Sequence, residues 1–283
     1  MRIGRLEAIL LLGGPLIFLT LFFVLPLALM MADSAQTDTG QWTTAHYVKL
    51  AVDIYYWRVL LLSFEIGLEV TLICFALGYP LAYFLTFRAQ STIFRRSIYV
   101  VLVTPLFTNN VVRAFGWIVM LGRNGLVNQS LLTLGLVEAP LPLAYSKTAI
   151  VVSLAYTLMP FMVLAVASVL QNLDRSLVEA ARDLGANPGL TFLKITFPLS
   201  LPGVIAGSLI IFTLTVSAYV TPSIMSGGRQ MVMSMLIFQQ YMVVFDFNFG
   251  AALSVLLLAM TLLLVLAYVL VLERRAKAVG LTS

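Results

Sequence analysis

Six stretches of the chain are long and apolar enough to cross a lipid bilayer as helices, since a span needs about 20 predominantly apolar residues. The first stretch is too long for the hydrophobic region of a typical signal peptide, and no clear cleavage motif ends it, so we interpret it as a retained span. We predict an all-α, polytopic membrane protein with six transmembrane helices, at about residues 9–31, 59–87, 98–121, 148–170, 201–222 and 249–272.

The composition supports this class. Of the 283 residues, 61% are hydrophobic and 10% are charged, whereas soluble domains carry about 25% charged residues. The single cysteine, Cys74, can form no intrachain disulfide and is expected to be a small buried hydrophobe. The basic residues lie in short loops rather than in clusters with aromatics, so we expect no nucleic-acid partner.

The distribution of Lys and Arg predicts the orientation. With the N- and C-termini in the cytoplasm, eleven of the 17 basic residues lie on the cytoplasmic side and five, including Lys147, lie outside. Arg113 falls within the third span. This orientation places residues 171–200 in the cytoplasm.

Residues 174–198 form a polar block between the fourth and fifth spans. Asp174 can cap a helix, Gly185 can end it in a left-handed conformation, and residues 187–189 signal a turn. A second short helix is expected over about 190–197, so that residues 171–200 make a helix–turn–helix elbow. The apolar face of the first helix would consist of Leu177, Ala180, Ala181 and Leu184.

The block closely resembles the coupling loop of ABC importer permeases, with its Glu-Ala-Ala motif, glycine and Ile-x-x-Pro. Here the motif residues are Glu179, Ala180, Ala181, Gly185, Ile195 and Pro198, with the aromatic Phe192. In that family the elbow fits a groove on the ATP-hydrolysing subunit. The resemblance implies docking through Glu179, Ala180, Ala181, Arg182 and Gly185; the alternative is an amphipathic helix resting on lipid headgroups.

Three further segments resemble the polyamine branch of these permeases: residues 78–83, 104–117 and 219–228. The resemblance implies the type I importer fold, one transmembrane domain over residues 1–283, and a location in the bacterial inner membrane. It also implies three kinds of partner: a second, non-identical permease subunit, an ATPase dimer and a periplasmic binding protein. The implied cargo is spermidine or putrescine, although ferric iron, phosphonates, thiamine and opines remain alternatives.

Catalytic motifs are missing from the sequence. It contains no G-x-x-x-x-G-K-[ST] phosphate loop, no H-E-x-x-H and no G-x-S-x-G. We therefore expect a transport subunit rather than an enzyme, with no bound cofactor or metal and with ATP and Mg²⁺ on the partner ATPase. The lone His46, in an outer loop, is a poor metal site.

Charged residues within spans are costly and suggest functional sites. Glu65 and Glu69 share one face of the second span, and the estimated depths would let Glu65 pair with Arg113 of the third. Asn109 and Asn110 lie one turn from Arg113.

Two interpretations of these groups remain open. Either they face the translocation path, where a spare carboxylate favours a cationic solute, or Glu65 and Arg113 neutralise each other between helices. The pair itself fits the second interpretation better, and Glu69 is the better path candidate. Tyr219 and Thr221, at the polar end of the fifth span, are further path candidates. An ion-coupled carrier could also use buried acids, but it would leave residues 174–198 unexplained.

Overall fold

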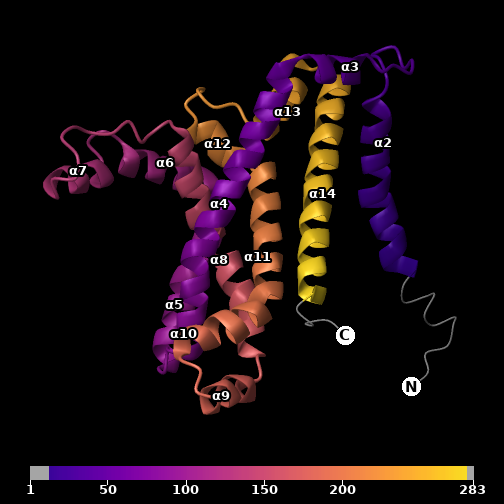
Figure 1. Cartoon of the computed structure of the whole chain (residues 1–283). Helices are drawn as coiled ribbons and strands as arrows, with labels where there is room; N and C mark the ends of the chain where they lie inside the picture. Colours follow the sequence, from indigo (N-terminus) through magenta and orange to yellow (C-terminus); the bar gives the residue numbers. More distant parts are fainter. Residues whose placement is uncertain (1–12, 279–283) are drawn as a thin grey trace. The chain divides into compact units, whose positions relative to one another are not determined.

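The computed structural model describes residues 13–278, and this part of the chain is mostly helical (Figure 1). Within it, an antiparallel bridge between Gln36 and Trp42 is isolated and belongs to no strand. Helices long and apolar enough to cross a membrane confirm the predicted all-α membrane class. They cover Gly13–Asp33, Ile54–Phe87, Lys147–Gln171, Pro188–Ser217 and Phe247–Leu270, and a bent pair is a sixth candidate.

The chain divides into two compact units. One contains residues 13–58 and 236–262 of the described part, and the other contains residues 59–235 and 263–278. In chain order the helices are η1 (Thr20–Val24), α2 (Leu25–Asp33), α3 (Ala45–Val52), α4 (Ile54–Phe87), α5 (Thr92–Phe107), α6 (Asn110–Leu121), α7 (Leu126–Thr133), α8 (Lys147–Gln171), α9 (Arg175–Asp183), α10 (Pro188–Thr191), η2 (Phe192–Thr196), α11 (Phe197–Ser217), α12 (Val220–Met225), α13 (Met233–Gln239), η3 (Gln240–Val244) and α14 (Phe247–Ala278).

In the unit that contains residues 59–235, α8 and α11 pack against each other at the core. The side chains of Met162 in α8 and Ile211 in α11 are fully buried. The two backbones approach closely at Gly203, where an added Cβ would lie 2.8 Å from the carbonyl oxygen of Ala165. Small residues at such contacts allow the close packing on which helix association in membranes depends.

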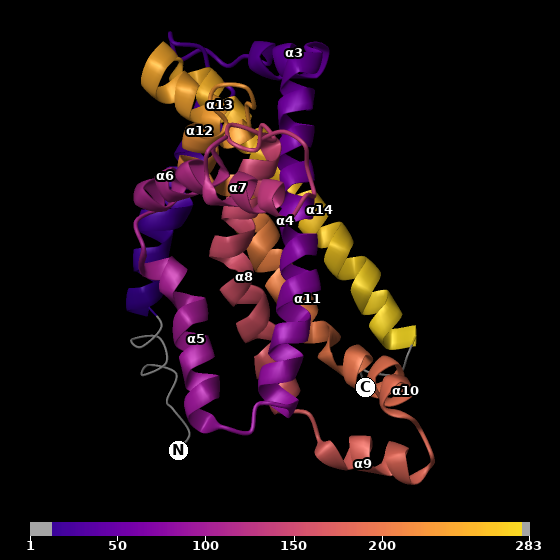
Figure 2. The same cartoon turned by 90° about the vertical axis from the view of Figure 1, so that its left-hand side faces the viewer.

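The third predicted span is not one straight helix. Residues 98–121 were expected to cross continuously, but α5 and the segment Asn110–Thr133 meet at 105° (Figure 2). The backbone is extended at Thr108, and the side chain of Asn109 caps α6 by accepting a bond from the amide of Val111. A new helix therefore starts at Asn110 in a different direction.

The fifth span starts earlier than predicted. A separate short helix was expected over 190–197, but the helical run begins at Pro188 and continues through η2 and α11 to Ser217. Pro198 explains the π-helix η2, because proline lacks an N–H and its ring clashes with the carbonyl four residues earlier, here that of Lys194. One wider turn keeps the run helical past this point.

In the unit that contains residues 13–58, aromatic and polar contacts gather around the start of α14. Tyr56 packs edge-on against Phe249, and the ammonium of Lys49 lies 4.1 Å from the centre of the same ring. His46 is half-buried, and its Nε2 lies 3.1 Å from the carbonyl oxygen of Gln36. His46 thus takes part in a structural hydrogen bond.

Candidate functional site

Glu65 and Glu69 of α4 share one cationic partner. They lie one helical turn apart, and the Nζ of Lys147 is 2.6 Å from an oxygen of Glu65 and 2.7 Å from an oxygen of Glu69. Lys147 is the first residue of α8, whose start is capped by Ser146 through a bond from the amide of Ala149. The cluster therefore joins the middle of α4 to the beginning of α8.

The charges of this cluster do not balance. Two carboxylates face one ammonium, and the N-terminal amides of α8 offset only part of the excess negative charge. The side chains of Glu65, Glu69 and Lys147 are 58%, 41% and 26% exposed. Ion pairs between side chains that are this exposed contribute about 0–1 kcal/mol each to the free energy of unfolding. The cluster has the chemistry to accept a further cationic group.

The predicted pair between Glu65 and Arg113 is wrong. The guanidinium of Arg113 donates hydrogen bonds to the carbonyl oxygens of Pro105 and Thr108 and to the side-chain oxygen of Asn110. The predicted depth assumed a continuous third span, and the 105° bend invalidates it. Arg113 and Asn110 are brought together, but together with the capping Asn109 they hold the corner between α5 and α6.

Tyr219 and Thr221 lie at a break after α11. The fifth span was expected to reach Pro222, but α11 ends at Ser217 and Ala218 is extended. Pro222 has no N–H to give the carbonyl of Ala218, and that carbonyl instead accepts a 2.6 Å bond from the hydroxyl of Ser234. Tyr219 is half-buried at the start of α12, and Thr221 is buried.

The first helix of the elbow, α9, begins and ends as its sequence predicts. The carboxylate of Asp174 accepts a 2.9 Å bond from the amide of Ser176, and this backbone bond lowers the pKa of Asp174. Gly185 has a φ of +81°, and the amide of Ala186 bonds the carbonyl of Ala181 at 3.0 Å. This is the Schellman arrangement that closes helix C-termini. The helix α9 is thus fixed at both ends.

The outer surface of α9 is open. In Figures 1 and 2, α9 lies beyond the ends of α8 and α11. Glu179 and Ala180 are exposed and Leu184 is 89% exposed, whereas Ala181 is buried. The predicted apolar face is therefore divided, with Ala181 turned inward and Leu184 outward. The side chain of Arg182 lies outside the described residues.

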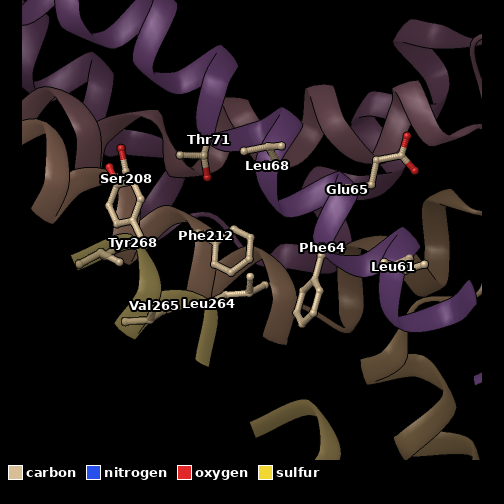
Figure 3. Close-up of a pocket in the computed structure, with 11 residues that line it drawn as sticks. Leu61, Phe64, Glu65, Leu68, Thr71, Ser208, Phe212, Leu264, Val265 and Tyr268 are labelled. Atoms are coloured by element: carbon tan, nitrogen blue, oxygen red, sulfur yellow. The ribbon is translucent and has the colours of Figure 1, made fainter. Parts of the chain in front are cut away.

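An apolar cavity of about 480 Å³ lies beside Glu65 (Figure 3). In the figure the carboxylate of Glu65 points away from Phe64 and Phe212, so that only its hydrocarbon part borders the cavity. The cavity suits hydrocarbon rather than ions. Its lining residues are Leu61, Phe64, Glu65, Leu68, Thr71, Ser208, Leu209, Phe212, Leu264, Val265 and Tyr268.

Sequence reasoning missed Lys147 as the partner of the acids. The charge distribution places Lys147 in an outer loop, whereas the preceding Ser146 is a helix-capping residue and is the signal that places Lys147 in the first turn of α8. Among the side chains that the structure describes, no group of three His, Cys, Asp or Glu could hold a metal ion.

The chain is similar to known transport proteins over most of its length. Residues 75–277 match the family model "Binding-protein-dependent transport system inner membrane component". The chain is 33% identical over 252 residues to the spermidine/putrescine transport system permease protein PotB of Escherichia coli (strain K12), covering 89% of this chain and 90% of PotB.

Two solved structures share the fold. One is a bacterial ABC transporter involved in the import of the acidic polysaccharide alginate, with a TM-score of 0.75, 18% identity and 95% coverage of both chains. The other is a bacterial alginate ABC transporter in complex with an alginate pentasaccharide-bound periplasmic protein, with a TM-score of 0.73, 18% identity and 93% and 92% coverage. The chain belongs to the family of binding-protein-dependent transport system inner membrane components, and it is a multi-pass permease subunit of an ABC importer.

Proposed function

We propose that this permease carries a polyamine, such as spermidine or putrescine, that a periplasmic binding protein delivers. The observation that carries the proposal is the 33% identity to PotB across 89% of the chain. The charge imbalance around Lys147 agrees with it, because a polyamine presents several ammonium groups to carboxylates. Charge-assisted bonds of that kind are about twice as strong as neutral ones.

Within this proposal Glu69 and Glu65 face the polyamine along its path. Their carboxylates lie close together and are partly exposed, and the single ammonium of Lys147 leaves acceptor capacity unused. Tyr219 and Thr221 are further path candidates at the break after α11. The corner residues around Arg113 serve the fold of the path wall.

The elbow is proposed to dock on a separate ATP-hydrolysing subunit, which binds the ATP and Mg²⁺. Support comes from the two caps that make α9 rigid and from its exposed residues, Glu179 and Ala180. The full assembly would contain an ATPase dimer, this chain and a second, non-identical permease. Residues 1–283 would form one transmembrane domain, with the elbow at 171–200 and both termini in the cytoplasm.

Reconstitution tests the proposal. The complex of both permeases and the ATPase is placed in proteoliposomes with the binding protein, and ATP-dependent uptake of radiolabelled spermidine and putrescine is measured. We expect uptake by the wild type and a fall of about fivefold or more in Glu69→Gln, because one ionic contact is lost. Glu138→Gln, at an exposed carboxylate outside the cluster, is the matched control and should retain uptake.

The possible results test the polyamine cargo and the role of Glu69 separately. Absence of spermidine and putrescine uptake by a wild-type complex that hydrolyses ATP would refute the polyamine assignment. Uptake by the wild type with unchanged kinetics in Glu69→Gln would remove Glu69 from the path.

A further inference from the structure

Two sequence segments that lie far apart in the chain meet at a buried hydrogen bond. Tyr79 belongs to α4 and Ser200 to α11; both side chains are buried, and their hydroxyl oxygens lie 2.9 Å apart. The hydroxyl of Ser200 donates to the carbonyl of Phe197 at 2.8 Å. Since Ser200 has one proton to donate, Tyr79 is the donor of the bond between them.

Aromatic rings surround this bond. Phe192, the first residue of η2, packs edge-on against Tyr79 and Tyr83, with ring centres 5.9 Å and 5.4 Å apart. Tyr79 also packs edge-on against Phe197 at 5.6 Å. We call Tyr79, Tyr83, Phe192, Phe197 and Ser200 the aromatic joint.

The joint lies where the elbow enters the membrane domain. The helical run from Pro188 follows the turn after Gly185 and reaches Phe192 within about one helical turn. On α4, Tyr79 is ten residues from Glu69, which corresponds to about 15 Å along the helix. One continuous helix thus connects the joint to the acidic pair.

The joint combines two kinds of contact. Edge-on rings are held by packing and can slide, whereas a buried hydrogen bond is directional and costly to leave unmade. The bond between Tyr79 and Ser200 therefore fixes the register of α4 against the start of α11.

We propose that the aromatic joint passes movements of the elbow into α4, and that Tyr79 is the positioning residue that keeps this transmission stiff. The proposal rests on the proposed docking of the elbow on an ATPase. It makes the inner half of α4 part of the coupling pathway, although α4 is distant in sequence from the elbow.

The test measures transported solute per ATP hydrolysed in the reconstituted complex, with radiolabelled spermidine as the probe. Tyr79→Phe removes one oxygen and keeps the ring. We expect ATP hydrolysis to continue and the transport-to-hydrolysis ratio to fall about fivefold, the factor that corresponds to about 1 kcal/mol, a typical net value for one hydrogen bond. Tyr99→Phe is the matched control and should keep the wild-type ratio, because Tyr99 lies in α5 outside the joint and its buried hydroxyl has no hydrogen-bond partner among the described residues.

The double variant Tyr79→Phe with Ser200→Ala separates coupling from stability. Ser200→Ala alone would leave the buried hydroxyl of Tyr79 without its partner and is destabilising, whereas removing both hydroxyls is nearly neutral for stability. If the joint transmits force, the double variant stays uncoupled although it is more stable than Ser200→Ala. A wild-type ratio in Tyr79→Phe or in the double variant would overturn the proposal. Failure of the wild type to transport spermidine would instead count against the proposed cargo, and failure of the ATPase to bind the wild type would count against elbow docking.

Discussion

Replacing Gly203 by alanine adds one methyl group at the closest approach between α8 and α11. The new Cβ would lie 2.8 Å from the carbonyl oxygen of Ala165 and 3.0 Å from the Cα of Val166. Both neighbours are backbone atoms of a buried helix and cannot rotate away. The two helices must therefore move apart by a few tenths of an ångström.

The expected cost follows from two opposing effects. Overpacking of a tight contact costs about 1–3 kcal/mol, and alanine regains up to about 1 kcal/mol in helix propensity over glycine. Gly203→Ala should therefore lower the free energy of unfolding by up to about 2 kcal/mol. Gly116→Ala in α6 is the matched control: a Cβ there meets no atom within 4 Å, so this variant should gain up to about 1 kcal/mol.

The single cysteine of the chain provides a site for measuring this change in stability. Cys74 is the single cysteine, and it is fully buried. A thiol-reactive fluorogenic dye in detergent reports exposure of this core residue on heating. A change of 1 kcal/mol corresponds to about 2–4 °C in the midpoint for a chain of this size. We expect a lower midpoint for Gly203→Ala and an unchanged or higher one for Gly116→Ala.

A midpoint for Gly203→Ala at or above that of the wild type would refute the reasoning. It would mean that the backbones of α8 and α11 do not meet at Ala165, or that they separate without loss of packing.

Two further substitutions test other parts of the unit that contains residues 59–235. The side chain of Asn128 donates to the carbonyls of Gly122 and Leu141 and accepts from the amide of Leu141. Asn128→Ala should therefore lower the free energy of unfolding by about 2–3 kcal/mol. The midpoint of Cys74 labelling should fall, and an unchanged midpoint would contradict this role of Asn128. Gly185→Val places a branched residue in a left-handed conformation, which costs about 1–2 kcal/mol at this turn. Membrane insertion should persist, while the amount of solute transported per ATP hydrolysed should fall. Normal transport would exclude a coupling role for this turn.

The ends of α9 were predictable because they depend on near neighbours. Asp174 caps an amide two residues away, and Gly185 closes a helix whose last bonds lie within five positions. The apolar spans were predictable for a similar reason, since their lengths reflect the thickness of the bilayer. The bend in the third span was missed, although the polar run Thr108-Asn109-Asn110 interrupts its apolar stretch and Asn109 is a residue type that caps helices.

The sequence by itself determined the membrane class, the positions of most spans and the capped elbow, because hydropathy and capping act through residues close together in the chain. Only the tertiary structure decided that Lys147, not Arg113, faces Glu65 and Glu69, and that Tyr79 reaches Ser200. Those partners depend on which helices pack together. Contacts between segments far apart in the chain decide that packing, so the local sequence does not record it.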